Sequence, residues 1–571
     1  MPTASAQDIT IDVQVSSERS FTALQSYAHG ETATGLLFFG GLADLGLHVF
    51  GNNAFPISKF STNVILVDRA TGDITISGTA NWPPAVRRAL KVTAPAFVQF
   101  DEELLVYGGY GPQKGDYNTR PTVAVINLAA VENDIRTLGS VQPGSVTVAA
   151  SIEGKVAGAG IARLDNDRYI LFGGADAEGD YANSGDPIYS DEGHLFDRSI
   201  SITDPQVTYN DGLGFSSPMH RRDVNVLPVT VPDGTGTRPG FVVMSGVFRN
   251  GIFAWETPLI WGDGDTEIYH DETFTQHLGA YEGPVVSLYS AGRRTNSIIN
   301  CSGLSAYDYH EDTQTFTWNP STPWTQHITQ TRIVDGIFTS ETIVGEMPWP
   351  LTNAALIVEP SLPRAGNGQV LIDQLPVDTP ILLGRIYGGI AAEAPGDEPP
   401  TFPSDDVYDV YFTIAGVPGQ AATLDAYAIN FGSYVSGGLA ELSASDDQYM
   451  RVQSQFGFQS SQPNILRITC DFTSPLQTPE SLDITTELKA NNPAGTQRIS
   501  LYNFDAGTFR TIADQSIGLA EQVHVVNHID ATGYVRASDR RVQLRVHQVF
   551  VATFSVSGFR TSFDHIAIDV R

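Results

Sequence analysis

Gly35-Leu-Leu-Phe-Phe-Gly-Gly41 is a short apolar run that ends in a pair of glycines, and the same pattern returns five more times. The later copies are Leu104-Leu-Val-Tyr-Gly-Gly109, Tyr169-Ile-Leu-Phe-Gly-Gly174, Phe241-Val-Val-Met-Ser-Gly246, the degenerate Ile298-Ile-Asn-Cys-Ser-Gly303 and Leu382-Leu-Gly-Arg-Ile-Tyr-Gly-Gly389. An apolar run closed by glycines predicts a β-strand that meets a close neighbour and then turns sharply. Six copies, about 70 residues apart, indicate a repeat architecture.

Each copy is expected to contribute one small sheet. Second strand-like runs, Asn63–Asp68 and Val123–Asn127, follow the first two copies. A small sheet cannot bury both faces alone, so we predict an all-β propeller of six stacked blades. Asp8–Val15 alternates and is expected to close the ring beside Val407–Thr413. The alternatives are a seventh blade within 305–360, or a β-sandwich with accidental glycine pairs.

The texture of the chain changes near Ala415–Thr423, a stretch rich in glycine and proline. The part beyond it has no glycine-pair repeat and carries alternating runs such as Asn464–Thr469 and Val542–His547. Alternation of this kind predicts a β-sandwich. We therefore expect two domains, a propeller over 1–415 and an accessory β-sandwich over 424–571.

The composition describes an acidic protein that can build a large core. Its 571 residues include 64 acidic and 33 basic side chains, for a formal charge of -31, and 41% are hydrophobic. This charge argues against nucleic acid and anionic membranes as partners. No apolar stretch reaches the ~18 residues of a spanning helix, so we expect no membrane insertion. The two cysteines, Cys301 and Cys470, are expected to be unpaired because they fall in strands of different domains.

The opening residues bear on the location of the protein. Ala4-Ser5-Ala6, followed by Gln7, has the small-x-small pattern that signal peptidase accepts. Three small residues that fell together by chance are the alternative. Together with the acidity and the low cysteine content, the pattern predicts a secreted or cell-surface protein.

The segment His220-Arg-Arg-Asp-Val-Asn225, followed by Ser245-Gly-Val-Phe248, resembles a stretch in a group of secreted bacterial proteins with kelch-like propellers. Those proteins more often carry an aromatic residue where this chain has Val224. Over 1–415 the repeat is similar to the kelch class, and the tail, through Tyr434–Ala440, resembles accessory β-sandwiches of bacterial surface proteins. These resemblances imply a fold and an extracellular location, and they imply no reaction.

The same segment supplies the strongest candidates for ligand binding: His220, Arg221, Arg222, Asp223 and Asn225. In a kelch-like blade the strand before the glycine-pair strand is innermost, so these residues are expected at the mouth of the central channel. Two guanidiniums there can hold a carboxylate or sulfate. The alternative is an internal Arg–Asp network that ties the blades together. Since side chains alternate along a strand, we expect one arginine to bind ligand and the other to be structural.

Further candidates surround the same axis. Comparable inner positions hold His29, Arg163 and Glu282, and loops just past the glycine-pair strands hold His48, Tyr110, Tyr117 and Tyr181. Aromatic and polar residues on loops at one end of a propeller suit stacking on sugar rings. Ordinary loop packing is the alternative for each of them.

Metal and enzyme motifs are sparse. Asp263, Asp265 and Glu267 space three carboxylates at i, i+2 and i+4, which predicts a calcium site, with solvated loop carboxylates as the alternative. The sequence lacks the common zinc-protease, serine-hydrolase and phosphate-loop motifs. Cys301 lacks the Tyr–Cys–His pattern of the copper radical oxidases, which also join a propeller to a β-sandwich. We expect no required cofactor.

The leading hypothesis is a secreted or cell-surface recognition protein whose propeller face binds an extracellular ligand, with a glycan as the expected ligand. A polysaccharide-active enzyme, hydrolase or lyase, with paired carboxylates at the channel mouth is the first alternative. A structural protein that self-assembles in a surface layer is the second. Propellers host both recognition proteins and enzymes, so the fold alone does not separate the first two hypotheses.

Overall fold

The computed structural model describes residues 9–570 except 49–52, 182–186, 198–201, 203–206, 210–216, 235, 251, 416–419, 444–447, 455–463, 480, 492–494 and 551–558. The chain divides after Ala415 into two compact units. We call the part before this point the first unit and the part after it the second unit. Both are all-β, with a few short helices.

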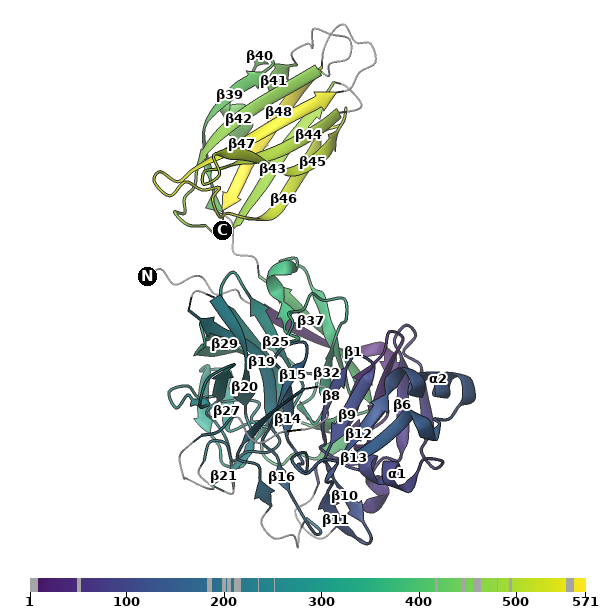
Figure 1. Cartoon of the computed structure of the whole chain (residues 1–571). Helices are drawn as coiled ribbons and strands as arrows, with labels where there is room; N and C mark the ends of the chain where they lie inside the picture. Colours follow the sequence, from purple (N-terminus) through teal and green to yellow (C-terminus); the bar gives the residue numbers. More distant parts are fainter. Residues whose placement is uncertain are drawn as a thin grey trace. The chain divides into compact units, whose positions relative to one another are not determined.

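The first unit contains six larger sheets that follow one another along the chain (Figure 1). The first three are β3 (Ala28–Glu31), β4 (Gly35–Phe39), β6 (Asn63–Asp68) and β7 (Ile74–Gly78); β8 (Ala96–Phe100), β9 (Glu103–Tyr107), β12 (Thr122–Asn127) and β13 (Val146–Ala150); and β14 (Gly160–Arg163), β15 (Arg168–Phe172) and β18 (Gly193–Asp197). The last three are β19 (Asn225–Asp233), β20 (Gly236–Met244), β23 (Leu259–Gly262) and β24 (Tyr269–His270); β25 (Val285–Ser290), β26 (Thr295–Leu304), β29 (Trp324–Val334), β30 (Ile337–Glu346) and β33 (Val370–Leu371); and β32 (Ala355–Val358), β34 (Ile381–Tyr387), β37 (Asp406–Ile414) and β1 (Ile9–Ser20).

The central strands of these sheets are buried on both faces, which explains their nearly continuous apolar runs. In β4, Leu37 and Phe39 pack against the second sheet, whereas Leu36 and Phe38 pack against the sixth. Corresponding hydrophobic clusters join the second sheet to the third, the third to the fourth, the fourth to the fifth and the fifth to the sixth. Each sheet therefore shares a core with the sheet before it and with the sheet after it.

The sixth sheet is built from both ends of the first unit. Strand β1 pairs with β37 in antiparallel register, with Ile9 opposite Ile414 and Val13 opposite Val410. The pairing predicted from the alternation of the first residues is thus confirmed. Residues 305–360 form the hairpin β27 (Tyr307–His310) and β28 (Thr315–Trp318), the strands β29, β30 and β32, and the short β31 (Leu351–Thr352). These fully described residues form no separate four-stranded sheet.

Two helices lie beside the first two sheets. Helix α1 spans Pro84–Leu90 and begins with proline at its first position. Helix α2 (Leu128–Leu138) was not predicted, although Asn127 caps its start by accepting a hydrogen bond from Ala130 N at 2.8 Å. It buries Leu128, Val131 and Ile135, one face of a helix, against the core between the two sheets.

The second unit is a β-sandwich. One sheet contains β40 (Ser433–Ser436), β41 (Met450–Gln453), β48 (Arg560–Val570), β43 (Ser481–Ala490) and β46 (Gln522–Asp530), with β38 (Gln420–Ala421) paired to β48; the other contains β39 (Thr423–Phe431), β42 (Asn464–Thr473), β47 (Arg541–Phe550), β44 (Gly495–Asn503) and β45 (Thr508–Ile517). The two sheets share one hydrophobic cluster, in which Ile468 and Leu544 of one sheet meet Ile484 and Ile568 of the other.

Both cysteines are buried and free, as the sequence predicts. Burial raises the pKa of each thiol to about 12, so neither is a nucleophile at neutral pH. No helix among the described residues has the length and apolar character that crossing a membrane requires.

Candidate ligand-binding site

One pocket of about 290 Å³ lies where six strands, one from each sheet, begin: β3, β8, β14, β19, β25 and β32. We call these the first strands of their sheets. The residues just ahead of these strands line it: Ser26, Ala94, Gly158, Asp223, Tyr281 and Asn353. We call it the aromatic pocket because its wall also carries Phe55, Tyr110, Tyr181, Phe248 and Trp324. Segments that lie far apart in the sequence therefore converge on one concave surface.

The glycine pairs allow this convergence. Gly173 has a φ of 71°, and a Cβ there would lie 2.8 Å from the carbonyl oxygen of Arg221, in the segment that leads into β19. Gly174 N donates a hydrogen bond to the same oxygen at 2.9 Å. Only glycine permits both the left-handed backbone and so close an approach. Each glycine-pair strand can thus meet the start of the next sheet at the pocket.

Arg221 is a buried structural residue. Its guanidinium donates to three backbone oxygens, those of Pro218 at 2.6 Å, Ser245 at 3.0 Å and Thr257 at 2.7 Å. Its Cζ lies 4.5 Å from the centre of the Trp255 ring. Burial lowers the pKa of Arg221 to about 9, and the nearby Arg249 adds to this effect. Arg221 therefore ties β20 and the loop after it to the start of β19 and presents nothing to a ligand.

Arg222, the next residue, lines the aromatic pocket, whereas Arg221 does not. Both residues lie ahead of β19, so the strand alternation used in the prediction does not apply to them. Its Cζ lies 4.4 Å from the centre of the Phe248 ring, and Nη2 donates to the Tyr181 hydroxyl at 3.1 Å. Its Nε lies 3.5 Å from Asp223 Oδ2. Burial opposes the charge, but Asp223 and the neighbouring tyrosines outweigh it and raise the pKa of Arg222. Arg222 remains a cation in the pocket wall.

Asp223 stands beside Arg222 with a φ of 53°, a left-handed conformation that aspartate adopts more readily than most residues. Its carboxylate is hydrogen-bonded by the Tyr281 side chain. Burial raises the pKa of Asp223, while Arg222 and Tyr281 partly offset this rise. The pocket therefore holds a cation and a carboxylate side by side.

His220 and Asn225 hold the shape of this segment. The His220 ring stacks on Tyr189 with 3.7 Å between ring centres, and its Nδ1 lies 2.9 Å from Asp191 Oδ1. Asn225 Nδ2 donates to Ser245 Oγ and to the backbone oxygen of Tyr281, each at 3.2 Å. These contacts place both side chains in structural roles, outside the aromatic pocket.

Three of the four predicted loop residues line the pocket: His48, Tyr110 and Tyr181. The His48 ring lies 4.9 Å from that of Tyr181. Tyr117 does not line the pocket; it stacks on Tyr110, and its hydroxyl donates to the Phe55 oxygen at 2.6 Å. Ordinary loop packing, the alternative given for Tyr117 in the sequence analysis, accounts for these contacts.

Sequence reasoning missed several residues of the pocket wall, among them Phe55, Phe248, Tyr281 and Trp324. Phe248 follows the fourth glycine motif closely, as Tyr110 follows the second. That shared position was a usable signal. Trp324 belongs to β29, and nothing in its local sequence distinguishes it from a core tryptophan.

A second cavity of about 270 Å³, the inner cavity, is lined by the first strands themselves. Ser26 and Asn353 line both cavities. His29 and Glu282, two of the predicted inner residues, face it. Burial lowers the pKa of His29 to about 4, whereas burial and the charge of Asp223 raise the pKa of Glu282 to about 8. Both groups are therefore largely uncharged at neutral pH.

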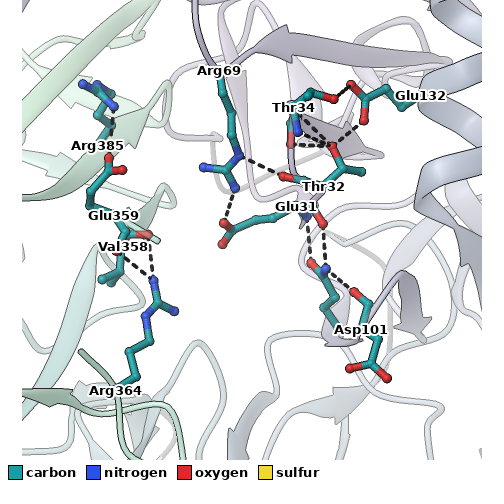
Figure 2. Close-up of polar contacts among 12 residues, drawn as sticks. Glu31, Thr32, Thr34, Arg69, Asp101, Glu132, Val358, Glu359, Arg364 and Arg385 are labelled. Carbon is teal, nitrogen blue, oxygen red and sulfur yellow. Dashed lines mark hydrogen bonds and ion pairs between the residues drawn. The ribbon is translucent and has the colours of Figure 1, made fainter. Parts of the chain in front are cut away.

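The other ends of the first strands are covered by the loop 359–369. Asn367 Nδ2 donates to the Val229 oxygen at 3.4 Å, and Gln369 Nε2 donates to Ser287 Oγ at 2.8 Å, so the loop reaches the fourth and fifth sheets. In Figure 2, Arg364 of this loop is bonded to the backbone oxygens of Val358 and Glu359. These contacts favour ligand entry from the aromatic pocket.

Charged groups join the elements at this covered end. Figure 2 shows Arg69 bonded to Glu31, and Arg385 paired with Glu359. The Arg385 Nη1–Glu359 Oε2 distance is 3.5 Å. Arg163, the remaining predicted inner residue, donates to the Asp165 oxygen at 2.9 Å and to Asn166 Oδ1 at 3.1 Å. It lines neither cavity.

Two of the three carboxylates predicted to bind calcium form ion pairs with arginines. Asp263 accepts two hydrogen bonds from Arg168, at 3.1 and 2.8 Å, and Asp265 pairs with Arg238 at 2.5 Å. Glu267 is exposed. Among the described residues, the acidic groups whose ligand atoms converge within 4.8 Å lie elsewhere. This geometry favours ion pairs at 263–265, and calcium there stays a prediction.

Comparisons with known proteins give little for this chain. No family model matches, and no curated protein does. Among solved structures, the chain has similarity to TmCBM61 in complex with β-1,4-galactotriose, with a TM-score of 0.19 and 6% identity over 26% of this chain and 91% of that one. A family 29 carbohydrate-binding module gives a TM-score of 0.13 at 8% identity, over 25% and 88% of the two chains. A CBM4 structure gives 0.14 at 12% identity, over 22% and 96%. TM-scores this low carry no argument about fold or function.

Proposed function

We propose that the first unit is a six-bladed, kelch-like β-propeller. The cyclic sharing of hydrophobic cores supports this, since the sixth sheet packs against the first through Ile357 and Tyr387 on one side and Phe38 on the other. The Tyr27 hydroxyl also donates to the Tyr387 oxygen at 2.5 Å. Pairing of β1 with β37 supports closure of the ring. In this reading the inner cavity is the central channel and the aromatic pocket is its mouth.

We propose further that this is a secreted or cell-surface protein that binds a glycan in the aromatic pocket. The observation that carries the proposal is the Arg222–Asp223 pair set among Phe248, Tyr181 and Tyr281. Sugars have apolar CH faces that stack on aromatic rings and hydroxyls that hydrogen-bond to charged groups, and a concave site with apolar walls and a few polar groups suits such ligands. The acidity of the chain, its low cysteine content and its resemblance to secreted propeller proteins support the location.

Titration calorimetry of the full chain against a panel of oligosaccharides tests this function. Tyr181→Ala removes one wall of the pocket and should weaken binding by about tenfold, since aromatic contacts contribute roughly 1 kcal/mol or more each. Tyr269→Ala is the matched control, because Tyr269 is 59% exposed and lies outside the pocket. Equal affinities for both variants, or no binding by the parent, would contradict the proposal.

The same incubations separate binding from catalysis. A binding protein leaves the oligosaccharides intact. New reducing ends, or unsaturated products absorbing in the ultraviolet, would support the polysaccharide-active enzyme instead.

A further inference from the structure

The charges in the aromatic pocket decide which kind of sugar it can accept. Besides His48 and the tyrosines, the ionisable side chains among the described lining residues are Arg222, Asp223 and Glu398. Glu398 is exposed, so water screens it. Asp223 Oδ2 lies 3.5 Å from Arg222 Nε and compensates the charge of the guanidinium. A ligand anion would therefore enter a pocket whose positive charge has a partner.

We propose that the aromatic pocket selects a neutral sugar with adjacent free hydroxyls over uronate and sulfated sugars. This inference rests on the glycan binding proposed above. One hydroxyl would donate to the Asp223 carboxylate, and its neighbour would accept from the Arg222 guanidinium. The pair can thus serve as a donor and an acceptor held side by side.

Both groups have the hydrogen-bonding capacity that this requires. Within the described residues, Arg222 gives one side-chain hydrogen bond, from Nη2 to Tyr181, and Nη1 remains for a ligand. A carboxylate accepts about four hydrogen bonds, and the side-chain donor to Asp223 is Tyr281. Hydrogen bonds to charged groups are the stronger ones, so a diol that bridges the pair gains from both.

A ligand carboxylate has no such arrangement available. It could accept from Arg222, but only beside the carboxylate of Asp223, and two like charges in a partly buried site repel each other strongly. Glu282 lies close enough for Asp223 to raise its pKa, so a further negative charge in this region is unfavourable. The formal charge of -31 also repels acidic polysaccharides at long range.

The aromatic rings complete the preference. Phe248 lies on the guanidinium of Arg222, and Tyr181 contacts the same group through its hydroxyl. A sugar ring stacked beside these aromatic rings would place its edge hydroxyls next to the Arg222–Asp223 pair. Moving a neutral pyranose into such a site costs less desolvation free energy than moving a carboxylate. Burying a charge costs far more than burying a hydroxyl that stays hydrogen-bonded.

Matched oligosaccharides that differ only at C6 test the inference by calorimetry at neutral pH: glucose and glucuronate oligomers, galactose and galacturonate oligomers, and mannose and mannuronate oligomers. For at least one pair, the parent protein should bind the neutral member about tenfold or more tightly than the acidic one. Asp223→Asn keeps the shape and the left-handed backbone, which asparagine also tolerates. This variant should bind the neutral sugar about tenfold more weakly and the acidic sugar more tightly than the parent does, so the ratio of the two affinities shifts.

Glu267→Gln is the matched control, because it removes the same charge from an exposed position outside the pocket. It should leave the ratio unchanged. Tighter binding of the acidic member by the parent, or an unchanged ratio in a folded Asp223→Asn protein, would overturn the neutral preference alone. If no oligosaccharide binds, the proposed function is overturned together with the neutral preference.

If Asp223→Asn does not fold, Tyr281→Phe supplies the second variant. This substitution removes the hydrogen-bond donor to the Asp223 carboxylate and should raise the preference for the neutral sugar. A lowered preference would count against the inference.

Discussion

Phe248 holds its ring against the guanidinium of Arg222, with 4.4 Å between the ring centre and Cζ, and it does so with a backbone φ of 76°. A left-handed conformation is rare for an aromatic residue and costs about 1–3 kcal/mol. The neighbouring Ser245 and Gly246 also have positive φ, at 66° and 110°. The segment after the fourth glycine motif is therefore strained at the point where it presents a ring to the pocket.

Replacing Phe248 separates the role of the ring from the strain of the backbone. Phe248→Ala and Phe248→Gly both remove the ring, but only glycine adopts a φ of 76° without penalty. We expect both variants to lose glycan affinity equally. The free energy of unfolding should be about 1 kcal/mol higher for Phe248→Gly than for Phe248→Ala, despite the greater flexibility of glycine. Denaturant titration measures the difference, and a less stable glycine variant would show that the backbone is unstrained.

The adjacent arginines should respond to substitution in opposite ways. Arg221→Met removes the donor from three backbone oxygens, two of them in buried hydrogen bonds, and is expected to lower stability by about 3–5 kcal/mol. Arg222→Met keeps much of the apolar stem over Phe248 and should lower glycan affinity by about 1.5–3 kcal/mol. Part of its effect on stability comes from Asp223, which loses its cation. Thermal melting and calorimetry of both variants check this, and similar melting temperatures would remove the distinction.

How far the sequence predicts this molecule can be seen from particular residues. The strands of the glycine-pair motif were predictable because their residues are buried on both faces, so that Leu36 to Phe39 form an unbroken apolar run. The pairing of β1 with β37 was predictable because both strands alternate. Helix α2 was missed although its signals were present: Asn127 as a cap, a buried face at Leu128, Val131 and Ile135, and Gly139 in left-handed conformation at its end.

The site was only half predictable, for a physical reason. Arg222 and Asp223 were selected because their segment resembles one in secreted propeller proteins and precedes a predicted inner strand. A difference between Arg222 and Arg221 was expected from the alternation of side chains along a strand, but both residues lie ahead of β19. Phe55 and Trp324 were missed because a pocket between loops depends on how distant segments converge, and no local pattern encodes that convergence. Tyr117 was assigned to the pocket on loop position alone, and its hydroxyl turns instead to Phe55.

Strand β1 should be required for the first unit to fold. It buries Ile9 and Ile11 in the core shared by the fifth and sixth sheets. Residues 1–415 expressed alone should melt cooperatively, since the core clusters of the first unit, as far as the structure describes the chain, contain no residue beyond Ala415. Residues 21–415 lose two buried isoleucines, worth about 3–6 kcal/mol, and expose the edge of β37. An equally stable shorter fragment would refute the role of β1 in closure.

The carboxyl of Glu282 should make stability depend on pH in a window set by its pKa. Burial in the inner cavity and the charge of Asp223 raise this pKa from its usual 4.5 to about 8. Tyr27 and Tyr281 also face the group, and His29 shares the cavity. Between these two pKa values the folded protein holds a proton that the unfolded chain has released. The contribution of Glu282 to the free energy of unfolding therefore falls as pH rises from about 4.5 to about 8 and changes little outside that window.

Glu282→Gln removes this titration while keeping a neutral side chain of the same size. The stability of the variant relative to the parent should therefore increase between pH 5 and pH 9, because the parent pays to hold an ionised carboxylate in the cavity at the higher pH. Comparing the two proteins at each pH cancels the titration of all other groups that the substitution does not disturb. Denaturant unfolding at both values supplies the measurement. A relative stability that stays constant, or that falls with pH, would mean that water or a counter-charge already stabilises the ionised form of Glu282 in the cavity.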